Sequence, residues 1–118
     1  MVTKKSIVIL GQKYLIKRKD FKNMEGNCGY TNHYSYEICI VNAKTLPDFK
    51  NANQEIIDAF EKETLRHEII HCFLNESGLG PCAHGTGSRS WSHNEEMIDF
   101  FAYQTPKIFK VFEELNIL

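Results

Sequence analysis

Apolar and polar residues alternate in the first forty positions of the chain, as is typical of β-strands. Two such runs, residues 6–10 and 13–19, lie on either side of Gly11, and the break at a glycine indicates a hairpin. A third run, residues 33–41, is rich in aromatic and β-branched residues at alternating positions. The pattern predicts an N-terminal antiparallel sheet of about three strands.

The period of the apolar positions changes after Pro47. From about residue 51 to residue 76 they recur at intervals of three and four, the spacing of one face of an α-helix. These positions are Ile56, Ile57, Phe60, Leu65, Ile69, Ile70, Phe73 and Leu74. Asn51 or Asn53 is suitable to cap the start of this helix, and Gly78 to end it.

A second helix is expected from about residue 90, broken or re-initiated at Pro106. The segment between the two helices, residues 77–92, contains four of the seven glycines and is expected to be a loop. Such a loop is either a flap over a cleft or a plain connector. The fold class is therefore α+β, with the N-terminal sheet packed on the first helix.

Composition narrows the range of functions. A chain of 118 residues with 42% apolar residues can bury one ordinary core, so residues 1–118 are expected to form a single domain. Fourteen basic and fifteen acidic residues are scattered along it, and no basic cluster favours nucleic acid or an anionic membrane. The oligomeric state cannot be inferred from the composition.

The four cysteines, Cys28, Cys39, Cys72 and Cys82, are interpreted as reduced thiols, because nothing in the pattern suggests export. Cys72 is expected to be a core thiol. The first apolar run is too short for a signal peptide, and no stretch approaches the length of a membrane span. We therefore expect a cytoplasmic protein.

Three titratable residues, His67, Glu68 and His71, interrupt the apolar run of the first helix. Residues four apart on a helix lie about 40° apart around the axis and roughly 6 Å along it, so the two imidazoles can share one ion. Glu68 is placed to reach a water on that ion without binding the ion itself. This is the HExxH arrangement of a hydrolytic metal site, with Glu68 as the general base.

A structural role for these residues is the alternative, since histidines on helices are often only hydrogen-bonded. The apolar neighbours of Glu68 predict burial, however, and burying an ionised glutamate without a partner costs several kcal/mol. A metal ion supplies that partner. The pattern therefore favours one zinc ion per chain, held by His67, His71 and a third ligand from elsewhere in the chain.

The third ligand is sought downstream. Glu95 and Asp99 are four apart and lie on one face of the second helix. A competing role for Glu95 is a capping box with Ser92, in which its side chain would fold back onto the Ser92 amide. Cys82 and His84, in the glycine-rich segment, form a further C-x-H pair that could bind metal.

His67, Glu68 and His71 followed by Glu95-x-x-x-Asp99 resemble the gluzincin metallopeptidases, the thermolysin-like clan, in a minimal form. The resemblance covers about residues 38–108. It implies that Glu95 is the third zinc ligand and that Asp99 holds the ring of His67 by a hydrogen bond. Small proteins with this pattern are similar to metallopeptidases of prophages and mobile elements.

The resemblance implies hydrolysis of a peptide or protein substrate that lies extended along the strand Tyr34–Val41. A residue that stabilises the oxyanion is also expected, and His84, His93 and Tyr103 are the candidates. Two other functions stay open. One is a zinc-stabilised regulatory or binding module with little turnover, and the other is an interaction protein without metal.

Overall fold

A four-stranded sheet forms the first part of the fold in the computed structural model, which describes residues 4–82 and 90–118. Its strands lie in the order β1-β2-β4-β3 and comprise β1 (Ser6–Ile9), β2 (Gln12–Lys19), β3 (Gly29–Asn32) and β4 (Glu37–Val41). Leu10 and Gly11, both with positive φ, form the turn between β1 and β2. The predicted hairpin is confirmed.

The sheet differs from the predicted one because β2 and β4 pair in parallel, so it is mixed rather than antiparallel. The pattern also did not predict β3, a short strand that pairs antiparallel with β4. Residues 33–36 are a turn rather than the start of the expected strand. The Asn32 side chain accepts the N–H groups of Tyr34 and Ser35, so turn chemistry outweighs the strand propensity of the tyrosines.

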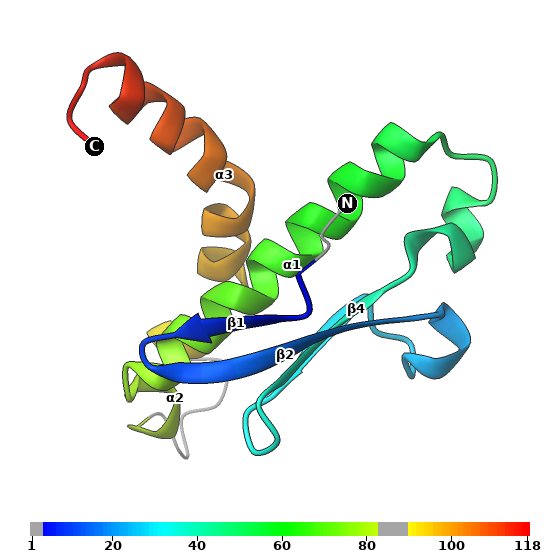
Figure 1. Ribbon diagram of the computed structural model, residues 1–118, viewed down its shortest axis with the longest axis horizontal. Helices are drawn as coiled ribbons and strands as arrows, with labels where there is room; N and C mark the ends of the chain where they lie inside the picture. The colour runs from blue at the N-terminus through cyan, green and yellow to red at the C-terminus, as the bar shows by residue number, and fades with distance from the viewer. Residues whose placement is uncertain (1–3, 83–89) are drawn as a thin grey trace.

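Helix α1 (Gln54–Glu76) lies across one face of the sheet (Figure 1). The Asn53 side chain caps its start by accepting the Ile56 N–H at 2.9 Å, and Gly78, with φ of 89°, follows its end. Both predicted boundaries are confirmed. The core between helix and sheet contains Ile9, Tyr14, Ile38, Ile40, Leu65 and Cys72, so the predicted core thiol is buried.

Short helices occupy most of the described connections. They are η1 (Phe21–Asn23), η2 (Ala43–Thr45), η3 (Pro47–Phe49), α2 (Leu79–Cys82) and η5 (Trp91–His93). Helix α2 and η5 lie in the segment expected to be a loop, which is therefore partly helical. Its central residues, 83–89, lie outside the described ranges, so neither the flap nor the connector interpretation is tested.

Helix α3 (Glu95–Glu114) crosses the C-terminal part of α1 and then extends away from the rest of the molecule (Figure 1). The expected break at Pro106 is wrong, because the helix is continuous through it. A proline has no N–H, so the Ala102 carbonyl one turn earlier lacks its helical donor. The Nε of Arg66 on α1 donates to that carbonyl at 2.6 Å and so joins the two helices.

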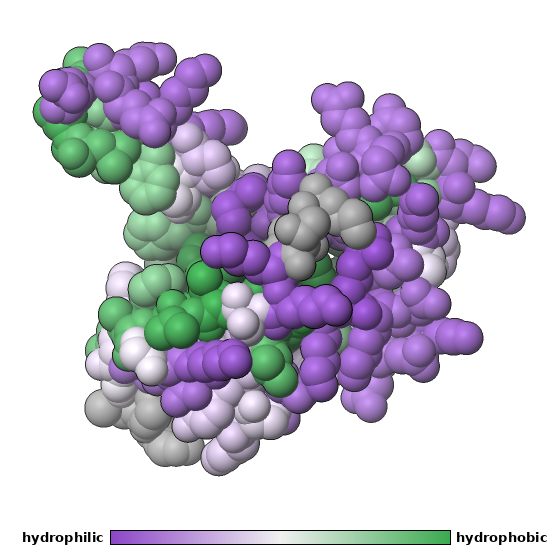
Figure 2. All heavy atoms as spheres, in the orientation of Figure 1, coloured by the Kyte–Doolittle hydropathy of each residue, from purple (hydrophilic) through white to green (hydrophobic). Residues whose placement is uncertain are grey.

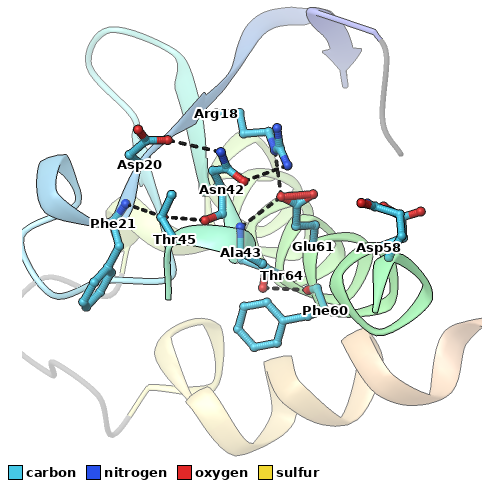
Figure 3. A network of polar contacts seen from close by, with 11 residues as sticks. Arg18, Asp20, Phe21, Asn42, Ala43, Thr45, Asp58, Phe60, Glu61 and Thr64 are labelled. Carbon is cyan, nitrogen blue, oxygen red and sulfur yellow. Dashed lines mark hydrogen bonds and ion pairs between the residues drawn. The ribbon is translucent and has the colours of Figure 1, made fainter. Parts of the chain in front are cut away.

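The N-terminal half of α1 is held to the sheet by Glu61, which is 3% exposed. Its Oε1 accepts the Arg18 Nε at 2.7 Å and the Ala43 backbone N–H at 3.1 Å (Figure 3). Arg18 also donates to Asn42 at the end of β4. This network ties β2, β4 and α1 together.

Within the described ranges, no helix has both the length and the apolar character needed to cross a bilayer.

Candidate metal centre

Three side chains from two helices converge where α3 begins beside α1. His67 and His71 point from α1, and their Nε2 atoms are 3.2 Å apart. The Glu95 carboxylate from α3 lies 3.1 Å from the His67 Nε2 and 3.4 Å from the His71 Nε2. The structure thus brings together the three residues predicted as ligands, and they could hold one metal ion.

The spacing of these atoms can be compared with that of a tetrahedral zinc site. Two ligand atoms at 2.0–2.1 Å from one ion, at the tetrahedral angle, lie about 3.3–3.4 Å apart. The two Nε2 atoms, 3.2 Å apart, are close to that value. The contacts with Glu95 are close to it as well, with Oε2 at 3.1 Å from the His67 Nε2 and Oε1 at 3.4 Å from the His71 Nε2. Two imidazoles and one carboxylate are also ligands that zinc commonly takes. The residues therefore fit zinc in both chemistry and separation.

Glu95 reaches this cluster because a different residue caps its helix. The Asn94 side chain accepts the Met97 N–H at 2.8 Å, so Asn94 is the N-cap and Glu95 is the first residue of α3. The Ser92 hydroxyl instead donates to the Leu79 carbonyl at 3.3 Å. The capping box is not formed, and the Glu95 side chain points to the histidines.

Asp99, one turn further along α3, contacts the other nitrogen of His67. Its Oδ1 lies 2.8 Å from the His67 Nδ1, the hydrogen bond expected from the resemblance. If Nδ1 carries the proton, Nε2 keeps its lone pair toward the cluster. Burial lowers the pKa of His71, which favours the neutral ring that a metal ligand requires.

Glu68 is 6% exposed and lies against the sheet beside these ligands. The Thr31 hydroxyl on β3 donates to its Oε2 at 2.7 Å. Burial raises the pKa of Glu68, and the Thr31 hydrogen bond opposes the shift in part. In the parts of the chain that the structure describes, no lysine or arginine forms an ion pair with Glu68.

Gly29 allows β3 to approach this close to α1. A Cβ on Gly29 would lie 2.8 Å from the Thr64 Cγ2 and 3.1 Å from the Glu68 Oε1. Both distances are shorter than ordinary van der Waals contact, so a side chain here would push the strand away from the helix. The absence of a side chain is what puts Thr31 within reach of Glu68.

A cleft of about 410 Å³ opens over the cluster. Its lining consists of Gly29, Tyr30, Thr31, His33, His67, Glu68, His71, His93 and Glu95. A second hollow, of about 530 Å³, shares His33, His71 and His93 with it and adds Tyr34, Tyr36 and Leu74. The candidate centre is therefore open to a ligand, with a partly aromatic hollow beside it.

The three residues considered for oxyanion stabilisation have different outcomes. His93 lines both hollows, with its Nε2 3.4 Å from the Gly80 carbonyl oxygen. Tyr103 lines a separate groove between α1 and α3, so the structure does not bring it to the centre. His84 lies outside the described residues, as does the Cys82 side chain, so the C-x-H pair is not tested.

Sequence reasoning missed four residues of the cleft, Gly29, Tyr30, Thr31 and His33. Thr31 is on the unpredicted strand β3, and His33 follows the turn residue Asn32. Burial lowers the pKa of His33, whose Nδ1 is 3.5 Å from the Tyr14 hydroxyl. Asn32 itself was the available signal, because an Asn side chain can accept backbone N–H groups two and three residues on and so favours a turn.

The strand expected to receive a peptide is also different. β4 is paired on both sides, with β2 and with β3, and cannot accept another strand. β3 is the edge of the sheet, and three of its residues line the cleft. The edge strand available beside the candidate centre is thus β3.

Comparison with protein-family models, with curated proteins and with solved structures finds no match to this chain. The gluzincin pattern is therefore a resemblance carried by a few residues and their geometry.

Proposed function

We propose that this protein is a zinc-dependent peptidase in which Glu68 is the general base. The observation that carries the proposal is the cluster of His67, His71 and Glu95, open to a cleft that Glu68 also lines. Both the ligand set and the adjacent carboxylate are what hydrolysis at a single zinc requires.

A bound zinc ion would polarise the scissile carbonyl and lower the pKa of a water molecule toward about 7. The chain supplies the proton transfers. Because Thr31 occupies the Oε2 of Glu68, Oε1 is the oxygen left to take the proton from water and to deliver it to the leaving amine. A raised pKa suits Glu68 to both steps, since a base that is too weak cannot accept the proton.

The other residues hold the geometry and the substrate. Asp99 orients the His67 ring through Nδ1. An extended peptide would add to the free edge of β3 by main-chain hydrogen bonds, which places it across the mouth of the cleft. His33 and His93, which border the cleft, are the candidates to donate a hydrogen bond to the oxyanion.

Metal analysis of the purified chain tests the first half of this proposal. We expect one zinc per chain, lost from a Glu95→Gln variant at chelator concentrations that the wild type withstands. Glu96→Gln is the matched control, because Glu96 is the next residue on the same helix turn and is not part of the cluster. A folded protein without metal, insensitive to chelator, would exclude the proposal.

Cleavage of a mixed peptide library tests the second half. The wild type loaded with zinc is expected to cut, and Glu68→Gln is expected not to. If the chain binds zinc but neither protein cuts peptides or test proteins, a zinc-stabilised binding module becomes the better interpretation, and the peptidase assignment is wrong.

A further inference from the structure

The C-terminal part of α3 carries apolar side chains that no other described segment covers. Beyond Pro106 every described residue except Ile108 is exposed, and this arm projects from the body of the molecule (Figure 1). Its green side chains are visible at the upper left of Figure 2. Among the large apolar residues here, Val111 is 51% exposed and Leu115 64%.

The chain as a whole exposes more surface than a compact monomer of its size. Its accessible area is 8144 Å², whereas a folded monomer of 13.7 kDa exposes about 6,600 Å². Its radius of gyration is 15.3 Å, against about 13.5 Å expected. The excess of about 1,500 Å² exceeds the roughly 800 Å² that one partner buries in a standard interface.

Five apolar residues of α3 lie on one side of the helix, and we call them the distal face. They fall within about 100° of arc around the helix axis, with Gln104 between the first and the second. From Ile108 onward they recur at the three- and four-residue intervals of a helix-pairing seam. The distal face consists of Phe101, Ile108, Val111, Phe112 and Leu115. Of the two buried residues of α3, Ala102 lies about 130° around the axis from the centre of the distal face, whereas Ile98 lies about 40° from Phe112 at its edge.

Two charged residues border the same side of the distal face. Lys107 and Glu114 are seven residues apart, so they lie two turns from each other in almost the same direction. If two copies of the helix pair antiparallel, Lys107 of one copy lies near Glu114 of the other, and the two-fold axis repeats the pair. In a parallel pair in register, the same flank of the two helices would lie on opposite sides of the seam, so Lys107 and Glu114 could not pair with each other.

We propose that two copies of this chain associate through the distal face of α3, with the helices antiparallel and Lys107 paired with Glu114 across the two-fold axis. The order of the two charges suits a second copy of this chain, and the apolar seam and the excess surface leave room for one. This proposal does not rest on the metal centre or on peptidase activity.

Sedimentation of the full chain over a range of concentrations tests it. We expect a reversible dimer whose Kd rises at least about 100-fold in Phe112→Glu, because two apolar contacts per dimer are lost and two charges are placed in the seam. Val8→Glu is the matched control. Val8 is a 63% exposed apolar residue on β1, and its replacement should leave the Kd unchanged.

A charge exchange tests the antiparallel arrangement. Lys107→Glu alone and Glu114→Lys alone should each weaken the dimer, by about 5-fold, because each creates two like-charge pairs. The double exchange restores opposite charges and should bring the Kd back to within about 2-fold of wild type. A double variant weaker than either single variant would overturn the antiparallel pairing.

A chain that stays monomeric at about 100 µM would overturn the proposal, whether or not it binds lipid vesicles or another protein through α3. A dimer insensitive to Phe112→Glu would overturn it as well, since the interface would lie elsewhere. Circular dichroism and zinc content, measured on the same samples, separate these outcomes from misfolding and from a failure of the proposed function.

Discussion

Two buried glutamates on one helix face the sheet from positions seven residues apart, and their surroundings differ. Glu61 is 3% exposed and Glu68 6%. Glu61 accepts hydrogen bonds from the Arg18 guanidinium and the Ala43 amide. Glu68 accepts one from the neutral Thr31 hydroxyl. The same residue type at equal depth is thus compensated by a cation in one place and by an alcohol in the other.

A buried carboxylate can stabilise the fold or take part in proton transfer, depending on the groups that surround it. A buried charge costs several kcal/mol unless it is paired, and Arg18 offsets that cost at Glu61. At Glu68 the Thr31 hydroxyl compensates only part of the cost of burying the charge, so the pKa of this carboxyl is raised. A carboxyl whose charged form is less favoured takes up a proton more readily, so Glu68 is suited to proton transfer and Glu61 to holding the fold.

Glu68→Gln is expected to have the largest effect, and on activity alone. Peptide cleavage by the zinc-loaded protein should fall by about 100- to 10,000-fold, because a glutamine cannot accept the proton of the attacking water. Thermal unfolding and zinc content should stay near wild type, since the amide keeps the shape of the side chain. Retention of full activity would show that Glu68 is only a structural residue, like Glu61.

Glu61→Gln should produce the opposite result. Removing the charge leaves Arg18, whose side chain is 33% exposed, without its buried partner, and we expect the free energy of unfolding to fall by about 2–3 kcal/mol. Zinc content per folded chain should not change. Denaturant titration measures the effect, and Glu113→Gln, at an exposed position, is the control. An equal loss in both variants would refute the structural role of Glu61.

Asp99→Ala tests whether the hydrogen bond to His67 supports metal binding next to Glu68. Without its carboxylate the His67 Nδ1 loses the contact at 2.8 Å that sets the ring and its tautomer. Zinc affinity, measured by competition with a chromogenic chelator, should weaken by about 10- to 100-fold. Glu96→Ala, three residues earlier, should not change it. A drop in both would indicate a general effect of charge on α3.

Gly29→Ala tests the close packing of β3 against Thr64 and Glu68. The new methyl group would lie 2.8 Å from the Thr64 Cγ2, so we expect a loss of about 1–2 kcal/mol in unfolding free energy. Thr64→Ser removes that carbon but keeps the hydroxyl that donates to the Phe60 carbonyl. The double variant should therefore recover part of the loss. If the double variant is no more stable than Gly29→Ala, the contact with the Thr64 Cγ2 is not the cause of the loss.

Tyr14→Phe should give the smallest effect at neutral pH, and it concerns a third glutamate of the same helix. Glu76, like Glu68, accepts from a neutral hydroxyl, that of Tyr14, at 2.7 Å. Burial and this hydrogen bond raise the pKa of Tyr14 in the folded state, whereas the unfolded chain ionises near 10. The folded state therefore binds the proton more tightly, and stability falls as the pH rises above about 10.

The slope expected from Tyr14 is about 1.4 kcal/mol per pH unit above that point, and Tyr14→Phe should lack it. Unfolding free energies at two or three alkaline pH values measure the difference. Tyr34→Phe, at a 95% exposed position, should keep the wild-type slope. If the slope is the same in all three proteins, another group is responsible.

Local sequence determined the elements whose signals lie within a few residues. The glycine turn predicted the β1–β2 hairpin. The three- and four-residue apolar period predicted α1, with Asn53 marking its start and Gly78 its end. Because His67 and His71 are four residues apart on that helix, their convergence followed from helix geometry alone. The α+β class followed from the same patterns.

Tertiary structure decided what depends on contacts distant in sequence. The parallel pairing of β2 with β4, and the edge position of β3, have no local signature, because a crossover is selected by packing rather than by a turn. The continuity of α3 through Pro106 likewise depends on α1, whose Arg66 satisfies the carbonyl left without a donor.

The position of Glu95 depends on both the local sequence and the tertiary structure. The sequence permitted either a capping box with Ser92 or a metal ligand at Glu95, and the ligand was favoured because the capping box would leave the site one ligand short. The cap on Asn94 and the packing of α3 on α1 place the carboxylate beside the histidines. The sequence therefore determined which residues could form a site. The packing of two helices and an edge strand decided which of these residues meet, because only packing sets the distances between segments that are far apart in the sequence.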